Sequence, residues 1–182
     1  MLIAWALIYN VIVLPVLCIM VLLASLFNVK IRDGLKGRFR SFSTLRLCLL
    51  EKDMNKDIYW FHVASHGEFQ QALPVIEGLK EIDTNCLIFV SFFSPSGFNN
   101  VSNELIDCKF YLPLDFIWTI NRTINLINPK KIIFAGYDLW PNLVWMSRIK
   151  NIHTNIFATH INDRSLKTSP LASSFYRSLY GS

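Results

Sequence analysis

A short polar turn holds the residues of this sequence that are best suited to chemistry. Ser65-His66-Gly67-Glu68 follows an apolar run over residues 58–64 and precedes apolar residues at helical spacing. The glycine lets the backbone turn tightly, and a helix start offers unpaired N–H groups and a partial positive charge. The Glu68 carboxylate can therefore stabilise the start of the helix, or it can act as a general base that faces a cleft. The pattern alone leaves both roles open.

Two later turns carry polar groups that could bind a ligand. Ser94, Ser96 and Gly97 follow a second apolar run, and their hydroxyl and N–H groups could hold a phosphate or a sugar oxygen. The alternative is an ordinary helix cap. Arg164 could contact a phosphate from a loop near the end of the chain, although a loop arginine is often simply solvated.

The four cysteines do not form a recognisable pattern. Cys18, Cys48, Cys86 and Cys108 show no CxxC spacing and no paired histidines. The sequence therefore predicts isolated buried thiols, with no metal site and no disulfide framework. This prediction fits a reducing compartment.

The elements that would position these turns alternate regularly between strand and helix. The expected strands are residues 58–64, 86–93, 110–112, 131–135 and 152–158. The expected helices are residues 69–79, 97–106, 116–127, 139–149 and 165–180. Such alternation with short connections predicts an α/β fold with a doubly wound, Rossmann-like parallel sheet. Ligands bind at the carboxyl ends of such strands, so the turns at 65–68, 94–97, 136–142 and 159–164 are the expected site.

An apolar segment precedes this domain. Residues 2–27 carry no charge, and a helix needs about 20 apolar residues to cross a bilayer. A cleaved signal peptide is the alternative, but it would have a basic start and a shorter apolar core. We therefore expect one uncleaved transmembrane helix as an anchor (1–28), a basic juxtamembrane segment (29–56) and a Rossmann-like domain (57–182).

Positive charge is concentrated directly after the anchor. Six basic residues between Lys30 and Arg46 face the single Asp33, so this segment carries a net +5, equal to the net charge of the whole chain. The positive-inside rule then places the domain in the cytoplasm, with the basic segment against anionic lipid headgroups. A nucleic-acid partner is not expected, because the folded domain is close to neutral.

Four ordered segments resemble the Kdo (3-deoxy-D-manno-octulosonic acid) transferase family. They are Trp60-Phe61-His62-Val63-Ala64-Ser65-His66-Gly67-Glu68-Phe69, Ser91-Phe92-Phe93-Ser94-Pro95-Ser96-Gly97, Tyr111-Leu112-Pro113-Leu114-Asp115 and Leu139-Trp140-Pro141-Asn142. The anchor followed by Gly34-Leu35-Lys36-Gly37-Arg38 also looks like the start of this family. The resemblance covers essentially the whole chain.

The resemblance implies the first, acceptor-binding half of a two-domain GT-B glycosyltransferase of lipopolysaccharide synthesis. Kdo would pass from CMP-Kdo to a lipid A precursor at the bacterial inner membrane, with inversion and without a metal or cofactor. Glu68 matches the family's general base. The residues expected to bind substrate are Ser65, Gly67, Ser94, Ser96, Gly97, Asp138 and Arg164.

This chain departs from the family in two respects. Many relatives carry two acidic residues before the LWPN segment, whereas this chain has Gly136, Tyr137 and Asp138. We also expect no second, donor-binding domain within these 182 residues, and therefore acceptor binding without efficient transfer unless a separate partner supplies that domain. The alternatives are another GT-B glycosyltransferase and a membrane-tethered, non-catalytic fragment or binding domain.

Overall fold

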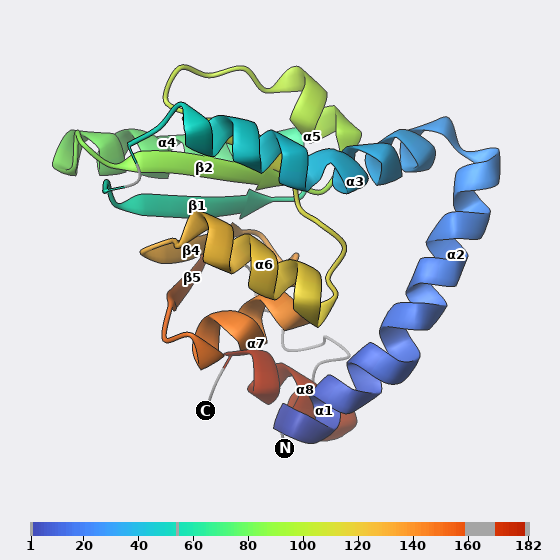
Figure 1. Ribbon diagram of the computed structural model, residues 1–182. Helices are drawn as coiled ribbons and strands as arrows, with labels where there is room; N and C mark the ends of the chain where they lie inside the picture. Colours follow the sequence, from blue (N-terminus) through green and yellow to red (C-terminus); the bar gives the residue numbers. More distant parts are fainter. Residues whose placement is uncertain (1, 54, 159–169, 181–182) are drawn as a thin grey trace.

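The computed structural model describes residues 2–53, 55–158 and 170–180, and it contains a parallel sheet of five strands (Figure 1). The strand order is β3-β2-β1-β4-β5, and all neighbouring pairs are parallel. The strands are β1 (Ile58–Val63), β2 (Leu87–Phe92), β3 (Cys108–Tyr111), β4 (Lys131–Ala135) and β5 (His153–Phe157). The predicted α/β fold with a Rossmann-like parallel sheet is confirmed.

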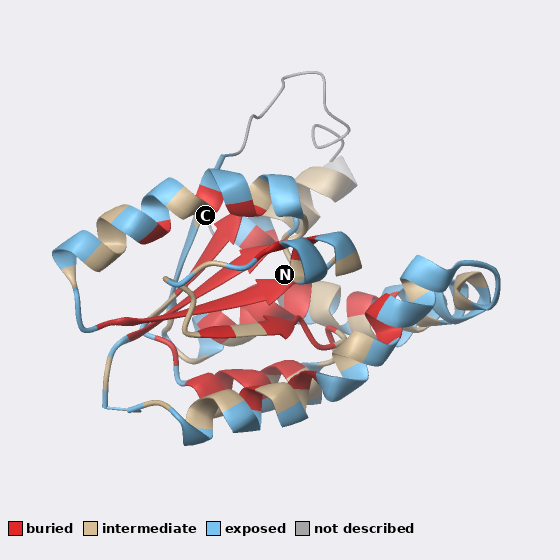
Figure 2. Ribbon diagram, turned by 90° about the horizontal axis from the view of Figure 1, so that it is seen from above, coloured by how far each residue is buried: buried red, intermediate tan, exposed pale blue. Residues whose placement is uncertain are grey.

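Helices cover both faces of the sheet. Successive strand residues point to opposite faces, so Trp60 and Phe89 belong to one core and Phe61 and Val90 to the other. The helices packed against the first core are α3 (Val29–Leu50), α6 (Ile117–Ile127), α7 (Pro141–Ile149) and α8 (Pro170–Tyr180). The helices packed against the second core are α4 (His66–Ile82) and α5 (Pro95–Asn100). Figure 2 shows buried strands between helices whose outer faces are exposed.

Local sequence signals explain three of the helix ends. Ser65 and Ser94 are the N-caps of α4 and α5, and α6 ends at Asn128 in the left-handed conformation. The predicted helix reaching Ile106 is wrong, because α5 ends at Asn100. Beyond it, the Asn103 side chain accepts a hydrogen bond from the backbone N–H of Leu105, an Asx turn that competes with a helix.

The apolar N-terminal segment is one long, bent helical arm. It comprises α1 (Leu2–Ile8), a π-helical turn η1 (Tyr9–Val13) and α2 (Leu14–Phe27). Residues Ile3–Phe27 are long and apolar enough to cross a membrane, by length and composition. In Figure 1, α1 lies beside α8, and α2 runs along one side of the molecule to the start of α3.

The basic segment after the arm is not an extended linker, because most of it forms α3. Asn28 caps α3 by accepting hydrogen bonds from the N–H groups of Lys30 and Ile31. The helix then packs across β3, where the Ser41 hydroxyl donates to the Tyr111 carbonyl at 2.7 Å. A Cβ atom on Gly37 would lie 2.4 Å from the Tyr111 ring, so only glycine allows this close approach.

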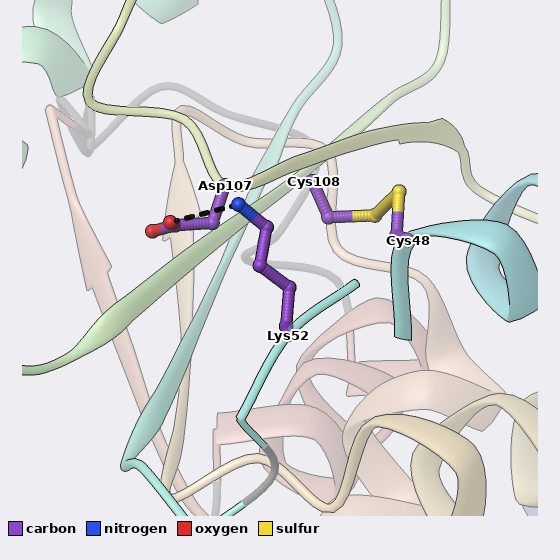
Figure 3. The surroundings of a disulfide bond; sticks show 4 residues. All are labelled: Cys48, Lys52, Asp107 and Cys108. Atoms are coloured by element: carbon purple, nitrogen blue, oxygen red, sulfur yellow. Dashed lines mark hydrogen bonds and ion pairs between the residues drawn. A yellow bond between two sulfur atoms is a disulfide. The ribbon is translucent and has the colours of Figure 1, made fainter. Parts of the chain in front are cut away.

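A disulfide joins Cys48 of α3 to Cys108 of β3 (Figure 3). The prediction of four isolated thiols is therefore wrong for this pair, while Cys18 and Cys86 are free. The two residues are 60 positions apart in sequence, but α3 returns along β3 and brings their Cα atoms to 5.8 Å. That separation is typical of a disulfide.

Candidate active site

The candidate site lies at the carboxyl edge of the sheet. From β1 the chain continues to β2 on one side, whereas β4 pairs with the other side of β1. The order thus reverses between β1 and β4, and ligands bind at such switch points in open α/β sheets. The strand arrowheads in Figure 1 point toward the side on which α2 runs. The edge that could bind a ligand therefore faces the apolar arm.

Glu68 is held at the start of its own helix. Its Oε2 atom accepts a hydrogen bond from the backbone N–H of Ala64, and the Ser65 hydroxyl accepts one from the N–H of Glu68 at 3.3 Å. This arrangement is close to a capping box, in which a serine and a glutamate satisfy each other's backbone donors. The helix-stabilising role considered for Glu68 is thus present in the structure.

The second carboxylate oxygen of Glu68 faces the turn after β4. A Cβ atom built on Gly136 would lie 2.9 Å from Oε1, and Gly136 has a φ of +89°. The carboxylate therefore lies between the turns after β1 and β4, at the switch point. Burial raises the pKa of Glu68, and the negative charge of Asp138 raises it further, while the Ala64 N–H opposes the shift. A raised pKa makes a carboxylate a better proton acceptor.

The turn after β2 is joined to the turn that contains Glu68. The backbone N–H of Ser94 donates to the Ala64 carbonyl at 2.9 Å. A Cβ atom on Gly97 would lie 3.2 Å from the carbonyl carbon of Ser65, so α5 packs directly on the Glu68 turn. The Ser94 hydroxyl caps α5 through the Gly97 N–H and also contacts the Ser96 hydroxyl at 3.0 Å. The helix cap considered for Ser94 is thus observed, and Ser96 remains exposed.

Most residues predicted to form the site are thus gathered at one edge. Ser65, Gly67 and Glu68 share one turn, Ser94, Ser96 and Gly97 share the adjoining one, and Asp138 belongs to the turn opposite Glu68. Arg164 lies outside the described residues. Within residues 2–53, 55–158 and 170–180, no group of three or more His, Cys, Asp or Glu residues could hold a metal ion.

A buried hydrogen-bond network near this edge joins β1, β2 and the residue that precedes α7. The Ser91 hydroxyl accepts a hydrogen bond from Trp60 Nε1 at 2.7 Å and lies 2.9 Å from His62 Nδ1. Trp140 Nε1 donates to His62 Nε2 at 3.1 Å. Because Nε2 accepts, Nδ1 carries the ring proton and donates to Ser91. Burial lowers the pKa of His62 to about 3, so the ring is neutral.

Sequence reasoning missed Arg38 as a site residue and counted it only among the basic residues. Its guanidinium lies 4.3 Å from the centre of the Phe93 ring and donates to the Phe93 carbonyl at 2.7 Å. Phe93 in turn packs on Trp140, with ring centres 5.0 Å apart. Burial lowers the pKa of Arg38 to about 10, which still leaves it charged at neutral pH. The one available signal was its position in the Gly34–Arg38 segment.

Comparisons with known proteins identify relatives of this chain. Residues 35–182 match the family described as 3-deoxy-D-manno-octulosonic-acid transferase (kdotransferase). The chain is similar to "3-deoxy-D-manno-octulosonic acid transferase" of Aquifex aeolicus, with 32% identity over 105 residues, 57% of this chain and 29% of the relative. It is similar to the protein of the same name from Haemophilus influenzae, with 34% identity over 108 residues, 58% of this chain and 25% of the relative.

A third relative covers more of the chain. The "Bifunctional glycosyltransferase/methyltransferase" of Fusobacterium nucleatum is 27% identical over 139 residues, 74% of this chain and 22% of the relative. The matched part thus spans less than a third of the length of each of these three proteins.

Proposed function

Because this chain belongs to the 3-deoxy-D-manno-octulosonic acid transferase family, we propose that it supplies the acceptor side and the general base for transfer of Kdo from CMP-Kdo to a lipid A precursor. The observation that carries this proposal is the Glu68 carboxylate, which lies at the switch point of the sheet with a raised pKa. The relatives' names support the sugar that is transferred.

Glu68 takes a proton in this reaction. A glucosamine hydroxyl of the acceptor attacks the anomeric carbon of Kdo, and the bond from that carbon to the CMP phosphate oxygen breaks. The bond electrons leave with CMP, and the hydroxyl proton passes to Glu68. A sugar hydroxyl is a poor nucleophile at neutral pH, so a positioned base contributes about 10²–10⁴-fold.

The groups around Glu68 bind the acceptor. Ser96 offers an exposed hydroxyl group, and Arg38 offers a positive charge at the same edge of the sheet. Together they suit a phosphorylated sugar. Ser65, Gly67 and Asp138 line the same turns. Arg164 is proposed as a phosphate contact on sequence grounds alone.

The domain acts on the cytoplasmic side of a bacterial inner membrane. The apolar arm anchors it, and the basic residues that follow lie near anionic headgroups. CMP-Kdo binds to a second domain, carried on the same protein or on a separate partner.

The test replaces Glu68 with glutamine and with alanine in the presence of a donor-binding domain. Transfer of labelled Kdo from CMP-Kdo to a lipid A precursor is measured alongside thermal unfolding. Glutamine still accepts the hydrogen bond from Ala64, so Glu68→Gln keeps the stability but loses about 10²–10⁴-fold in kcat. Glu68→Ala loses both. Activity of Glu68→Gln within twofold of the parent protein would leave Glu68 as a helix cap only.

A second candidate is transfer of a different activated sugar. It is favoured by the Fusobacterium relative, which covers 74% of this chain and whose name specifies only a glycosyltransferase and a methyltransferase. A donor screen with the same acceptor decides between the two: turnover with another nucleotide sugar, and none with CMP-Kdo, selects the second.

A further inference from the structure

The apolar arm is fixed to the domain near its beginning. Trp5 Nε1 donates to the Ser174 hydroxyl of α8 at 3.0 Å, and its ring meets Phe175 edge-on with centres 5.3 Å apart. Tyr9 follows at the π-helical turn, and its hydroxyl donates to the fully buried Asp115 at 3.0 Å. Polar contacts therefore hold the N-terminal end of the arm to the folded domain.

Asn10 adds a paired contact beside Tyr9. The side-chain amides of Asn10 and Asn142 hydrogen-bond each other in both directions, at 3.0 and 2.8 Å. The N–H of Asn142 also donates to Asp115 at 3.0 Å. Asp115 and Asn142 of the domain thus bind Tyr9 and Asn10 of the arm. We call these four residues the anchor seat.

The other end of the arm is fixed to the same domain. After the Asn28 cap the chain enters α3, which packs on β3 through Gly37 and Ser41 and is linked to it by the Cys48–Cys108 disulfide. Both ends of the apolar helix are therefore attached to one folded body.

These attachments conflict with a simple crossing of the bilayer. The helical stretch Ile3–Phe27 has 25 residues, and at about 1.5 Å per residue it is roughly 37 Å long, more than the hydrocarbon thickness of about 30 Å. If α3 starts at one surface, a crossing arm would carry Trp5 to the other. Helices α7 and α8 would follow it into the hydrocarbon, together with the exposed Arg148 and Arg177. Charged side chains inside a bilayer are strongly disfavoured.

The domain has its own apolar surface between the two attachments. Phe39 is 72% exposed and Trp118 is 66% exposed. Both line a hollow of about 220 Å³ between α3 and the start of α6, together with Phe42 and Phe116. Exposed aromatic residues of this kind favour the boundary between lipid and water. The basic residues Lys30, Arg32, Lys36 and Arg40 of α3 add positive charge at one end of this surface.

We propose that α1, η1 and α2 lie in one leaflet of the membrane, with both ends on the side of the domain, and that the partner of this surface is a leaflet with anionic headgroups. An in-plane helix keeps every contact of the anchor seat intact. It also brings the arm, whose apolar residues are exposed on all sides of α2, and the aromatic residues of the domain into the same leaflet. This inference does not depend on the identity of the transferred sugar.

The test maps the membrane side of both termini. An epitope is added ahead of Met1 or after Ser182, and the full chain is placed in a bacterial inner membrane. Protease is then added to spheroplasts, which expose the outer side, and to inverted vesicles. We expect both epitopes to be cut only in inverted vesicles. Cutting of the Met1 epitope in spheroplasts, or release of the protein from membranes by alkaline carbonate, overturns the proposal.

A cross-link tests the docked arm directly. In native membranes treated with a thiol oxidant such as copper phenanthroline, Trp5→Cys combined with Ser174→Cys is expected to form a disulfide. The control pair, Ile19→Cys with Ser174→Cys, is expected to stay reduced, because Ile19 is about 20 Å further along the helix. Equal cross-linking of both pairs, or of neither, contradicts docking, and the epitope result stands even if Trp5→Cys destabilises the fold.

Discussion

The Glu68 carboxylate lies against the backbone of Gly136, in the turn after β4, because this residue has no side chain that would displace it. A Cβ atom there would lie 2.9 Å from Oε1 and 3.1 Å from Cδ of Glu68, and the φ of +89° also disfavours any other residue. The space that a side chain at position 136 would fill is therefore occupied by the Glu68 carboxylate.

Replacing this glycine should move the carboxylate. Under the proposed function, and with a donor-binding domain present, Gly136→Ala is expected to reduce Kdo transfer by roughly tenfold or more, because the displaced proposed base loses its alignment. The variant should also destabilise the fold by about 1–3 kcal/mol through backbone strain. The matched control is Gly78→Ala in α4, where a Cβ atom meets nothing within 4 Å. That variant should gain about 0.5–1 kcal/mol and keep its activity. Transfer assays and thermal unfolding of both variants check this.

The pH dependence of transfer should report the charge on Asp138. The proposed base Glu68 can accept a proton only when it is deprotonated, so kcat/KM is expected to fall as the pH drops through its pKa, which lies above the ordinary value for glutamate. Asp138→Asn removes a negative charge that raises this pKa, so the acid limb of the profile should move to lower pH. Glu81→Gln, at the far end of α4, should leave it in place. If the acid limb of Asp138→Asn is unchanged, the charge of Asp138 does not raise the pKa of the proposed base.

The network beneath the site should be sensitive to loss of one hydroxyl. Ser91→Ala removes the partner of both Trp60 Nε1 and His62 Nδ1, which are buried. Leaving such donors unpaired costs about 1–3 kcal/mol. The exposed Ser43 bonds only within its own helix, so Ser43→Ala should change the stability by less than about 0.5 kcal/mol. Chemical denaturation followed by tryptophan fluorescence measures both.

The disulfide should stabilise the packing of α3 on the sheet. It closes a loop of 60 residues, for which the loss of chain entropy in the unfolded state gives roughly 4 kcal/mol. Denaturation with and without a reductant should show this difference in the parent protein and in Cys86→Ala, but not in Cys48→Ser. Free thiol counts under native conditions give an independent check: if Cys48 and Cys108 react with an alkylating agent as readily as Cys86, the bridge is not formed.

Local patterns in the sequence were sufficient for the number and order of the five strands and for the turns after β1, β2 and β4. The apolar run over residues 58–64 becomes β1, which ends at Val63, and the run over residues 131–135 becomes β4. The polar glycine-containing turn before Phe69 indicated where β1 would meet a helix. Because parallel strands end at a common edge, this was enough to bring Glu68, Ser94 and Asp138 into one site.

Contacts between distant segments could not be predicted in this way. Tyr9 meets Asp115 and Asn10 meets Asn142, 106 and 132 residues along the chain. A hydropathy pattern describes which face of a segment is apolar, but it does not say which other segment that face will meet. For the same reason, the sequence did not predict the Cys48–Cys108 disulfide or the contact between Arg38 and Phe93. Both depend on how α3 folds back across the sheet.

The anchor seat also sets an order of events during synthesis. The arm leaves the ribosome well before its partners Asn142 and Ser174, because Asn142 lies 132 residues after Asn10 and Ser174 lies 169 residues after Trp5. At about 5–20 residues per second, the delay is on the order of 10 s. During that interval Tyr9 and Asn10 have no docking site, and the newly made helix must be sheltered by lipid or by a chaperone. The arm thus reaches its native position only after residues far downstream of it have been made.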